Sequence, residues 1–191
     1  MRYQPGHKVE VHRKILKDAS RRVRAEGISG AAVSSVMRDA GLTHGGFYKH
    51  FRSKDELLTE SLREAFQEVA DRLTQAAEKS PRATAWKAIV KAYLSREHCD
   101  HAAYGCPLAA LASELARADP AMKARIRGEL IQYKNRMLLW MPGRRVADRE
   151  RAFFAIFSTM IGAVAIARIL PDRAARARVL AGARDFLLRS F

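Results

Sequence analysis

Apolar residues recur three and four positions apart along most of the chain, the spacing that places them on one face of an α-helix. The longest example runs from Lys54 to Lys79, where the apolar positions form one continuous stripe. No segment shows the strict alternation of apolar and polar residues that marks a half-buried β-strand. The pattern therefore predicts an all-α chain of about nine helices.

Proline residues and capping side chains mark several helix starts. Pro107 suits the first turn of one helix, Asp119-Pro120 caps the next, and Pro171-Asp172 precedes the last. We expect helices over residues 8–25, 54–79, from 81, from 107, from 120, over 148–170 and after 172, with a loop over 99–105. The helix over residues 54–79 is long enough to link two domains.

Residues 27–56 predict two short helices joined by a tight glycine turn, followed by the capped start of a third helix. One buried face of the first helix is formed by Val33, Val36, Met37 and Ala40. Gly41 follows, where a helix end favours a residue that tolerates positive φ. The hydroxyl of Thr43 is the expected N-cap of the second helix, whose Phe47 and Phe51 face inward. This is a helix-turn-helix with its second helix free to enter a DNA groove.

The other side chains of the second helix form a polar surface beside small residues. A glycine inside a helix costs roughly 1 kcal/mol, which makes sense where a sugar-phosphate chain approaches the backbone closely. The third helix begins with a capping box of Ser53 and Glu56, and Lys54 lies beside its phosphate-binding N–H groups. We expect Tyr48 and His50 mostly at phosphates and the start of the second helix nearer base edges. The candidate DNA contacts are Ser34, Thr43, His44, Gly45, Gly46, Tyr48, Lys49, His50 and Lys54.

The run from Gly41 to Leu58, GLTHGGFYKHFRSKDELL, strongly resembles the DNA-binding domain of the TetR/AcrR family of bacterial transcriptional regulators. Two departures occur. Ala31 stands where members of the family often carry Thr or Ser, which removes a cap and a phosphate contact that Ser29 or Ser34 can replace. Gly46 stands where a bulkier residue is common, so the base preference does not follow from the resemblance.

The resemblance implies a DNA-binding domain over residues 1–53 and a ligand-binding and dimerisation domain over residues 54–191. It also implies a homodimer whose last two helices form a four-helix bundle with the partner. Two recognition helices on a two-fold axis fit successive major grooves of a palindrome, about 34–36 Å apart. A ligand that prefers another spacing lowers the affinity for double-stranded DNA. The expected function is a repressor released from a palindromic operator by a small-molecule or thiol-reactive effector.

The charge of the chain agrees with a polyanionic partner. It has 35 Lys and Arg residues against 20 Asp and Glu residues, a net charge of +15. Residues 1–55 hold 12 basic and 5 acidic residues, so the charge density is higher at this end. A basic arm and first helical turns are formed by Arg2, Lys8, Arg13, Lys14 and Lys17. The alternatives are a solvated helix face for these residues and, for the whole chain, a non-specific nucleic-acid-binding helical protein.

The segment from Ala152 to Ala167 is apolar on nearly every helical face, and such a helix must be buried on all sides. In a chain of this size one side can pack on the core and the other on a second copy, and the last helix offers a second apolar stripe. A central helix of a monomer is the alternative. The candidate dimer contacts are Phe157, Ile161, Val164, Val179, Ala183 and Phe186.

Large aromatic residues in the C-terminal helices are candidates for an effector pocket. Their mixture, with no obvious internal charge, favours an apolar or aromatic ligand. For each of them ordinary core packing is the alternative. The candidate ligand contacts are Phe66, Trp86, Tyr93, Tyr104, Cys106, Trp140 and Phe153.

The segment His98-Cys99-Asp100-His101, together with Cys106, allows three interpretations. The set fits no standard zinc site, so we expect no metal. A disulfide between the two cysteines is not expected in the cytoplasm. Cys106 stands at the N-cap before Pro107, where a helix N-terminus favours a reactive thiolate. A small apolar residue that fills a corner is the alternative. The run GCPLAALASEL also resembles a stretch seen in many regulators of the family, which supports a structural role.

Catalysis and membrane insertion have little support in the sequence. We find no glycine-rich phosphate loop, no metalloprotease or nucleophile-elbow motif, and no paired carboxylates, so we expect neither an enzyme nor a cofactor. The N-terminus lacks the apolar stretch of a signal peptide. The longest uncharged apolar run has 16 residues, short of the ~20 needed to span a bilayer. We therefore expect a cytoplasmic protein.

Overall fold

The structure is a computed structural model that describes residues 5–191. Every regular element in that range is a helix, which confirms the predicted all-α fold. The elements are α1 (Pro5–Gly30), α2 (Val33–Asp39), η1 (His44–Lys49), α3 (Lys54–Glu78), η2 (Arg82–Thr84), α4 (Ala85–Tyr93), α5 (Arg96–Asp100), η3 (Ala102–Tyr104), α6 (Pro107–Arg117), α7 (Pro120–Leu138), α8 (Val146–Ile169) and α9 (Arg173–Ser190). Arg2 of the predicted basic arm lies outside the described residues.

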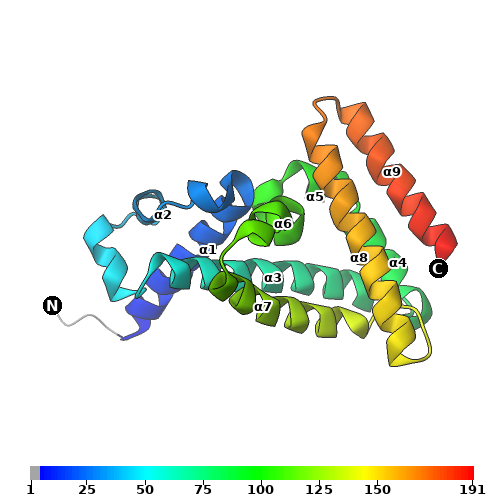
Figure 1. The fold of residues 1–191 in the computed structure, drawn as a ribbon, viewed down its shortest axis with the longest axis horizontal. Helices are drawn as coiled ribbons and strands as arrows, with labels where there is room; N and C mark the ends of the chain where they lie inside the picture. The colour runs from blue at the N-terminus through cyan, green and yellow to red at the C-terminus, as the bar shows by residue number, and fades with distance from the viewer. Residues whose placement is uncertain (1–4) are drawn as a thin grey trace.

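Helix α3 runs lengthwise through an elongated molecule (Figure 1). It packs against α1 near the start of the chain and against α4 and α7 along the rest of its length. The helix-turn-helix lies at one end of the molecule, and α8 and α9 lie at the other. The long linking helix predicted over residues 54–79 is thus confirmed, one residue shorter than expected.

Two hydrophobic cores meet along α3. Leu57, Leu58 and Leu62 in its first half belong to the core of the helix-turn-helix. Residues from Phe66 onward belong to the core of the C-terminal helices. The first core also includes apolar side chains of α6 and α7, so the helix-turn-helix shares its packing with the rest of the chain. The division at residue 53 therefore stays a prediction.

The segment predicted as a loop over residues 99–105 is partly helical, and that prediction is wrong. Ser95 accepts a hydrogen bond from the His98 N–H and so caps α5, and η3 follows directly. The helix predicted from residue 81 begins instead as the short η2 before α4. Gly27, expected beyond the end of the first helix, has φ 81° and interrupts α1. A side-chain cap explains the start of α5, and the positive φ of Gly27 explains the interruption of α1.

Candidate nucleic-acid interface

The turn between α2 and η1 is built as the sequence predicts. Val36 and Met37 are buried against the amino-terminal core. Gly41 has φ 76°, a conformation that glycine adopts without steric cost. The N–H of Leu42 donates to the carbonyl of Met37 over 2.8 Å, which closes the helix end. The turn fixes the angle at which η1 leaves α2.

The second helix differs from the prediction in kind. It is the 3₁₀ helix η1, not an α-helix of two turns. Thr43 is at its N-cap, but its hydroxyl accepts no backbone hydrogen bond, so the predicted side-chain cap is wrong. The reason is that the Gly46 N–H donates to the backbone carbonyl of Thr43 instead, over 3.0 Å. Phe47 and Phe51 are buried and stack with ring centroids 5.6 Å apart, as expected of the inward face.

The outer face of η1 is open to solvent. Tyr48 is 73% exposed, and His44, Gly45 and Lys49 are exposed as well. A Cβ added at Gly45 meets nothing within 4 Å, so packing within the chain does not require glycine there. The absence of a side chain at this position leaves the backbone accessible to an external partner.

A groove of about 800 Å³ separates η1 from the first turns of α1. It brings together five of the predicted DNA contacts: Thr43, Gly46, Tyr48, Lys49 and His50. Its other wall is formed by His7, Lys8 and Val11 of α1, of which only Lys8 was a candidate. His44, Gly45, Ser34 and Lys54 do not line the groove, although all four are exposed. The contribution of α1 has no local sequence signal, because the two walls are over 30 residues apart in the chain.

Positive charge gathers at this groove. Burial, together with the charges of His12, Lys8 and Lys49, lowers the pKa of His50. The Nδ1 atom of His50 is buried and has no hydrogen-bond partner. Lys14, by contrast, donates through Nζ to the carbonyl of Ala40 over 2.8 Å and therefore supports the end of α2.

The start of α3 forms the expected cap beside the groove. The Ser53 hydroxyl accepts from the Glu56 N–H over 3.1 Å. The carboxylate of Glu56 reaches back to the N–H of Arg52, one residue before the position expected for a capping box. Lys54 is exposed at this helix end, where free N–H groups favour an anion.

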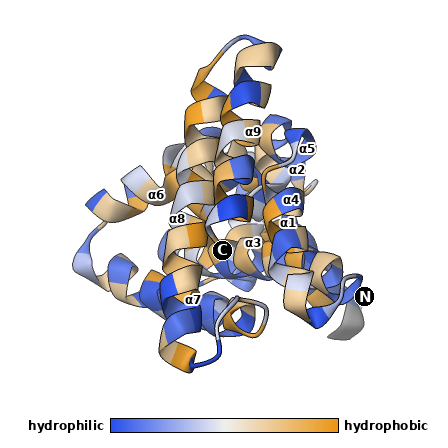
Figure 2. Cartoon of the chain, turned by 90° about the vertical axis from the view of Figure 1, so that its right-hand side faces the viewer, coloured by the Kyte–Doolittle hydropathy of each residue, from blue (hydrophilic) through white to orange (hydrophobic). Residues whose placement is uncertain are grey.

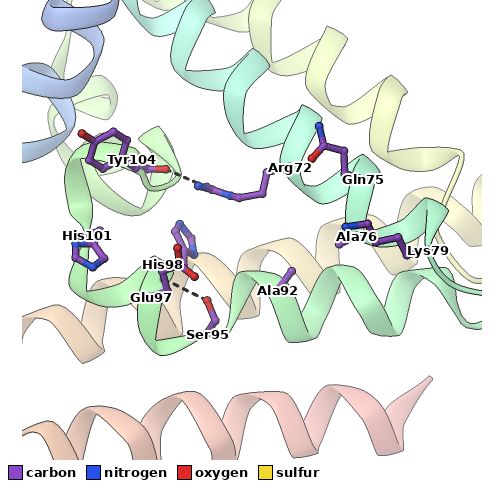
Figure 3. A pocket seen from close by; sticks show the side chains of 10 residues that line it. All are labelled: Arg72, Gln75, Ala76, Lys79, Ala92, Ser95, Glu97, His98, His101 and Tyr104. Atoms are coloured by element: carbon purple, nitrogen blue, oxygen red, sulfur yellow. Dashed lines mark hydrogen bonds between the residues drawn. The ribbon is translucent and has the colours of Figure 1, made fainter.

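The residues of the predicted aromatic effector pocket lie mostly in the packed core of the C-terminal helices, and their role in ligand binding stays a prediction. Five of the seven candidates are buried among neighbouring side chains of the C-terminal core: Phe66, Trp86, Tyr93, Cys106 and Phe153. Trp140 is half-buried beneath the guanidinium of Arg82, 4.8 Å from its ring centroid. Only Tyr104 lines a cleft, which has a volume of about 760 Å³ and lies between α3 and the α4–α5–η3 segment (Figure 3).

The residues around Cys106 are held by backbone contacts. Cys106 is the N-cap of α6 before Pro107, as predicted, but it is fully buried and its thiol makes no capping hydrogen bond. The Nε2 atom of His98 accepts from the Cys106 N–H over 2.8 Å, and its Nδ1–H donates to the Tyr93 carbonyl over 2.6 Å. Burial lowers the pKa of His98 to about 4, so the ring is neutral. Residues 5–191 contain no cluster of three potential metal ligands.

The predicted dimer contacts divide into three groups. Phe157 and Val164 are buried in the core of the chain, and their assignment to the dimer stays a prediction. Ile161, Val179 and Ala183 are half-buried against the same core. Phe186 is exposed, and so are three large apolar side chains of α8 that were not candidates: Phe154, Ile166 and Ile169. Figure 2 views the molecule from this α8–α9 end.

Helix α8 is also long and apolar enough, by length and composition alone, to cross a membrane. Less than half of the most apolar 18-residue stretch of this helix is buried within the chain. Because its buried side packs on α7 and α9, we attribute its composition to the core and to the exposed face just described.

Comparisons with known proteins agree with this geometry. Residues 15–60 match the family model described as bacterial regulatory proteins, tetR family. The chain is similar over 96% of its length to 97% of a TetR transcriptional regulator from Chloroflexus aurantiacus J-10-FL, with 22% identity and a TM-score of 0.75. Reduced NemR of E. coli gives 16% identity, a TM-score of 0.76 and coverage of 94% of this chain and 96% of NemR. FadR of Bacillus halodurans, a fatty acid degradation regulator, gives 18% identity, a TM-score of 0.70 and coverage of 98% and 97%. No curated protein sequence matches the chain.

Proposed function

We propose that this chain, a member of the TetR family by its amino-terminal domain and its fold, is a dimeric repressor that binds a palindromic operator and is released by an effector. The single observation that carries the proposal is the groove between η1 and α1. It combines an exposed tyrosine, two lysines and two histidines with the backbone of Gly46. These are groups that bind phosphates and base edges, held on a buried apolar scaffold.

The roles within the groove follow from position. Lys8 and Lys49 face each other across it and supply charge to phosphates on either side. Tyr48 and His50 offer hydrogen bonds to the same backbone. His44 and Gly45, at the exposed start of η1, are assigned to base edges. Lys54 is assigned to a phosphate at the N-terminus of α3.

A second copy completes the site. The exposed apolar residues of α8 and α9 at the far end of the molecule are suited to pack on the same residues of a partner. Such a dimer presents two η1 helices to one duplex, and successive major grooves on one side of the duplex lie about 34–36 Å apart. We assign residues 1–53 to DNA binding and residues 54–191 to dimerisation and effector binding.

Two kinds of effector fit the release step. A small molecule that binds the α3–α5 cleft is one. A thiol-reactive compound that modifies Cys106 is the other, and it requires the start of α6 to open because this thiol is fully buried. If Cys106 is the sensor, alkylation weakens operator binding, and Cys106→Ser removes that sensitivity while the variant still binds DNA.

Selection of duplexes from a random pool tests the proposal. We expect the bound sequences to converge on a palindrome, and the protein to prefer that palindrome to a scrambled duplex by at least about 10³-fold at moderate salt. A non-specific nucleic-acid-binding protein would select no common sequence and would bind both duplexes equally. That outcome, or a strictly monomeric protein, rejects the proposal.

A further inference from the structure

The cleft between α3 and the α4–α5–η3 segment is the largest cavity away from the DNA groove among those described in residues 5–191. Most of the residues that line it are polar or charged, in contrast to the aromatic core behind it (Figure 3). Arg72 of α3 and Lys79 at the C-cap of α3 form one side, while His98, His101 and Tyr104 form the other. A cleft of this size accommodates a small organic molecule.

The cleft carries uncompensated positive charge. Within the described part of the chain, neither Arg72 nor Lys79 forms an ion pair with a carboxylate, although most of the other arginines of α1, α3 and α7 do so. Glu97 is the one acidic residue in the lining. The guanidinium of Arg168 donates to the carbonyls of His98 and Cys99 just behind the wall. The positive charges of Arg168, Arg72 and Arg24 add to burial in lowering the pKa of His98.

The position of Arg72 allows its guanidinium to bind an anion in the cleft. Its side chain extends across the cleft toward Tyr104, and its Nη2 donates to the Tyr104 carbonyl over 2.9 Å. A guanidinium carries five N–H donors in a planar fork, and the other donors of Arg72 have no partner among residues 5–191. A fork of this kind matches two oxygens of a carboxylate or phosphate group.

We infer that this cleft is an effector site for a small organic oxyanion, a carboxylate or phosphate ester, which binds Arg72 and weakens its hold on the Tyr104 carbonyl. The inference rests on the proposed function for its consequence, the release of DNA, but not for the binding itself. It names the ligand class that the sequence left open and replaces the apolar ligand expected from the aromatic residues.

Tyr104 and its neighbour connect the cleft to the DNA-binding end. The guanidinium of Arg21 lies 5.0 Å from the centroid of the Tyr104 ring. Arg24 donates to the Gly105 carbonyl over 3.2 Å and to the Glu68 carboxylate over 2.6 Å, and its side chain is fully buried. Arg21 and Arg24 both belong to α1, whose first turns form a wall of the DNA groove.

The direction of the coupling follows from competition. An oxyanion that takes the Nη2 donor of Arg72 together with a second donor displaces the Tyr104 carbonyl, so binding of the anion favours a state in which η3 is free to shift. Because η3 contacts α1 through Arg21 and Arg24, the shift changes the position of the groove. An anion that binds this state better than the DNA-bound state lowers the affinity for DNA, and DNA lowers the affinity for the anion by the same factor.

The binding step is tested on the full protein without DNA. Benzoate and inorganic phosphate serve as probes, benzamide as the neutral counterpart of benzoate, and chloride at matched ionic strength as the salt control. We expect both anions to raise the melting temperature and benzamide to have no effect. In Arg72→Gln the affinity for benzoate falls at least about tenfold, as expected when a charged hydrogen-bond donor is lost.

Two further variants make this test specific. Lys91→Gln removes an exposed charge of α4 outside the cleft and keeps the response. Lys49→Gln removes a charge of the DNA groove, so a response that it abolishes belongs to that groove and overturns the inference. Equal binding of benzamide, an unchanged affinity in Arg72→Gln, or no response of the natural protein to either anion at millimolar concentration also overturns it.

The coupling step is tested with the selected palindrome. We expect benzoate to weaken DNA binding of the natural protein about tenfold, within the usual range of coupling between sites. The ratio of affinities with and without benzoate falls to one in Arg72→Gln. Tyr104→Ala keeps the backbone carbonyl but loses the ring over Arg21, so it binds benzoate and shows a reduced ratio. A full ratio in Tyr104→Ala rejects the route through η3, whereas failure to select any palindrome rejects the proposed function and leaves the anion-binding result standing.

Discussion

The two ends of the molecule expose large side chains in opposite electrostatic surroundings. At the amino-terminal end, Tyr48 lies in a groove beside Lys8, Lys49 and His50. At the other end, the exposed apolar residues of α8 include Phe154 and Ile166, within the 16-residue run that has no charged residue. An aromatic side chain surrounded by cations is typical of a surface that binds a polyanion. An uncharged apolar face is typical of a surface that packs on another apolar face. The two surfaces therefore call for different partners, DNA and a second copy of the chain.

The strongest test of the comparison places charge on the apolar face. Ile166→Asp combined with Phe154→Glu puts carboxylates where the proposed dimer buries apolar side chains. We expect the dimer to dissociate completely at micromolar concentration, because unpaired buried charges cost several kcal/mol. Sedimentation measures the association, and circular dichroism verifies that the helices persist.

Leu139 provides the matched control for that experiment. It is an exposed apolar residue at the C-cap of α7 and does not belong to α8 or α9, and Leu139→Glu should leave the dimer intact. A dimer that survives both substitutions on α8 excludes this face as the interface, and the comparison between the two ends then fails.

How far the sequence predicts each end follows from the same comparison. The helix-turn-helix was predictable because its signals are local: Gly41 marks a turn, and Phe47 and Phe51 are spaced to share a face. The dimer contacts were not, because a helix that is apolar on every face gives no angular preference. Phe157 and Ile166 belong to the same apolar run, yet Phe157 is buried in the core and Ile166 is exposed.

The cleft shows a second limit. Arg72 and Tyr104 are 32 residues apart in the chain and meet only because α3 runs beside η3. The aromatic candidates pointed to a pocket, but the Tyr133 ring fills the space between Phe66 and Phe157, with ring centroids 5.7 Å and 5.6 Å from its own. Whether large residues line a cavity or fill it depends on packing over long distances in sequence. Thr43 failed as a cap for a more local reason, because η1 is a 3₁₀ helix whose N–H bonds go to the backbone.

The next largest expected effect is a pH dependence of the folding stability, and it comes from His98, which lies between the two ends of the molecule. The pKa of His98 is lowered to about 4 in the folded chain, below the ordinary value of about 6.5. A lowered histidine pKa means that the unfolded chain binds the proton more tightly. The stability from the neutral ring is complete above pH about 6.5 and is lost as the pH falls toward 4, by about 3 kcal/mol in all.

Urea unfolding at a series of pH values measures this loss. His98→Gln removes the titrating group. The free energy of unfolding of this variant should therefore fall less steeply between pH about 6.5 and 4 than that of the natural protein. His50 has its pKa lowered as well and contributes a slope in the same direction in both proteins. Identical slopes for the natural protein and His98→Gln would show that burial does not keep this ring neutral in the folded chain.

Lys49→Ala sharpens the comparison at the DNA end. Its exposed ammonium is assigned to a phosphate, so the variant should bind the selected palindrome several-fold more weakly, and the salt dependence of its DNA affinity should fall by about one unit. The dimer affinity, which we attribute to apolar contacts, should be unchanged by the substitution and should not fall as salt rises. An unchanged DNA affinity and salt slope in Lys49→Ala would remove this residue from the interface.

The smallest effect compares a buried tyrosine with an exposed one. The Tyr133 hydroxyl is buried in the C-terminal core and has no hydrogen-bond partner. An unsatisfied buried polar group costs about 1–3 kcal/mol, so Tyr133→Phe should raise the free energy of unfolding by about 1 kcal/mol. Tyr48→Phe, in the open groove, should leave stability unchanged and weaken DNA binding if its hydroxyl contacts a phosphate. Chemical denaturation of both variants measures these free energies. A loss of stability in Tyr133→Phe would mean that the Tyr133 hydroxyl has a hydrogen-bond partner within the aromatic core.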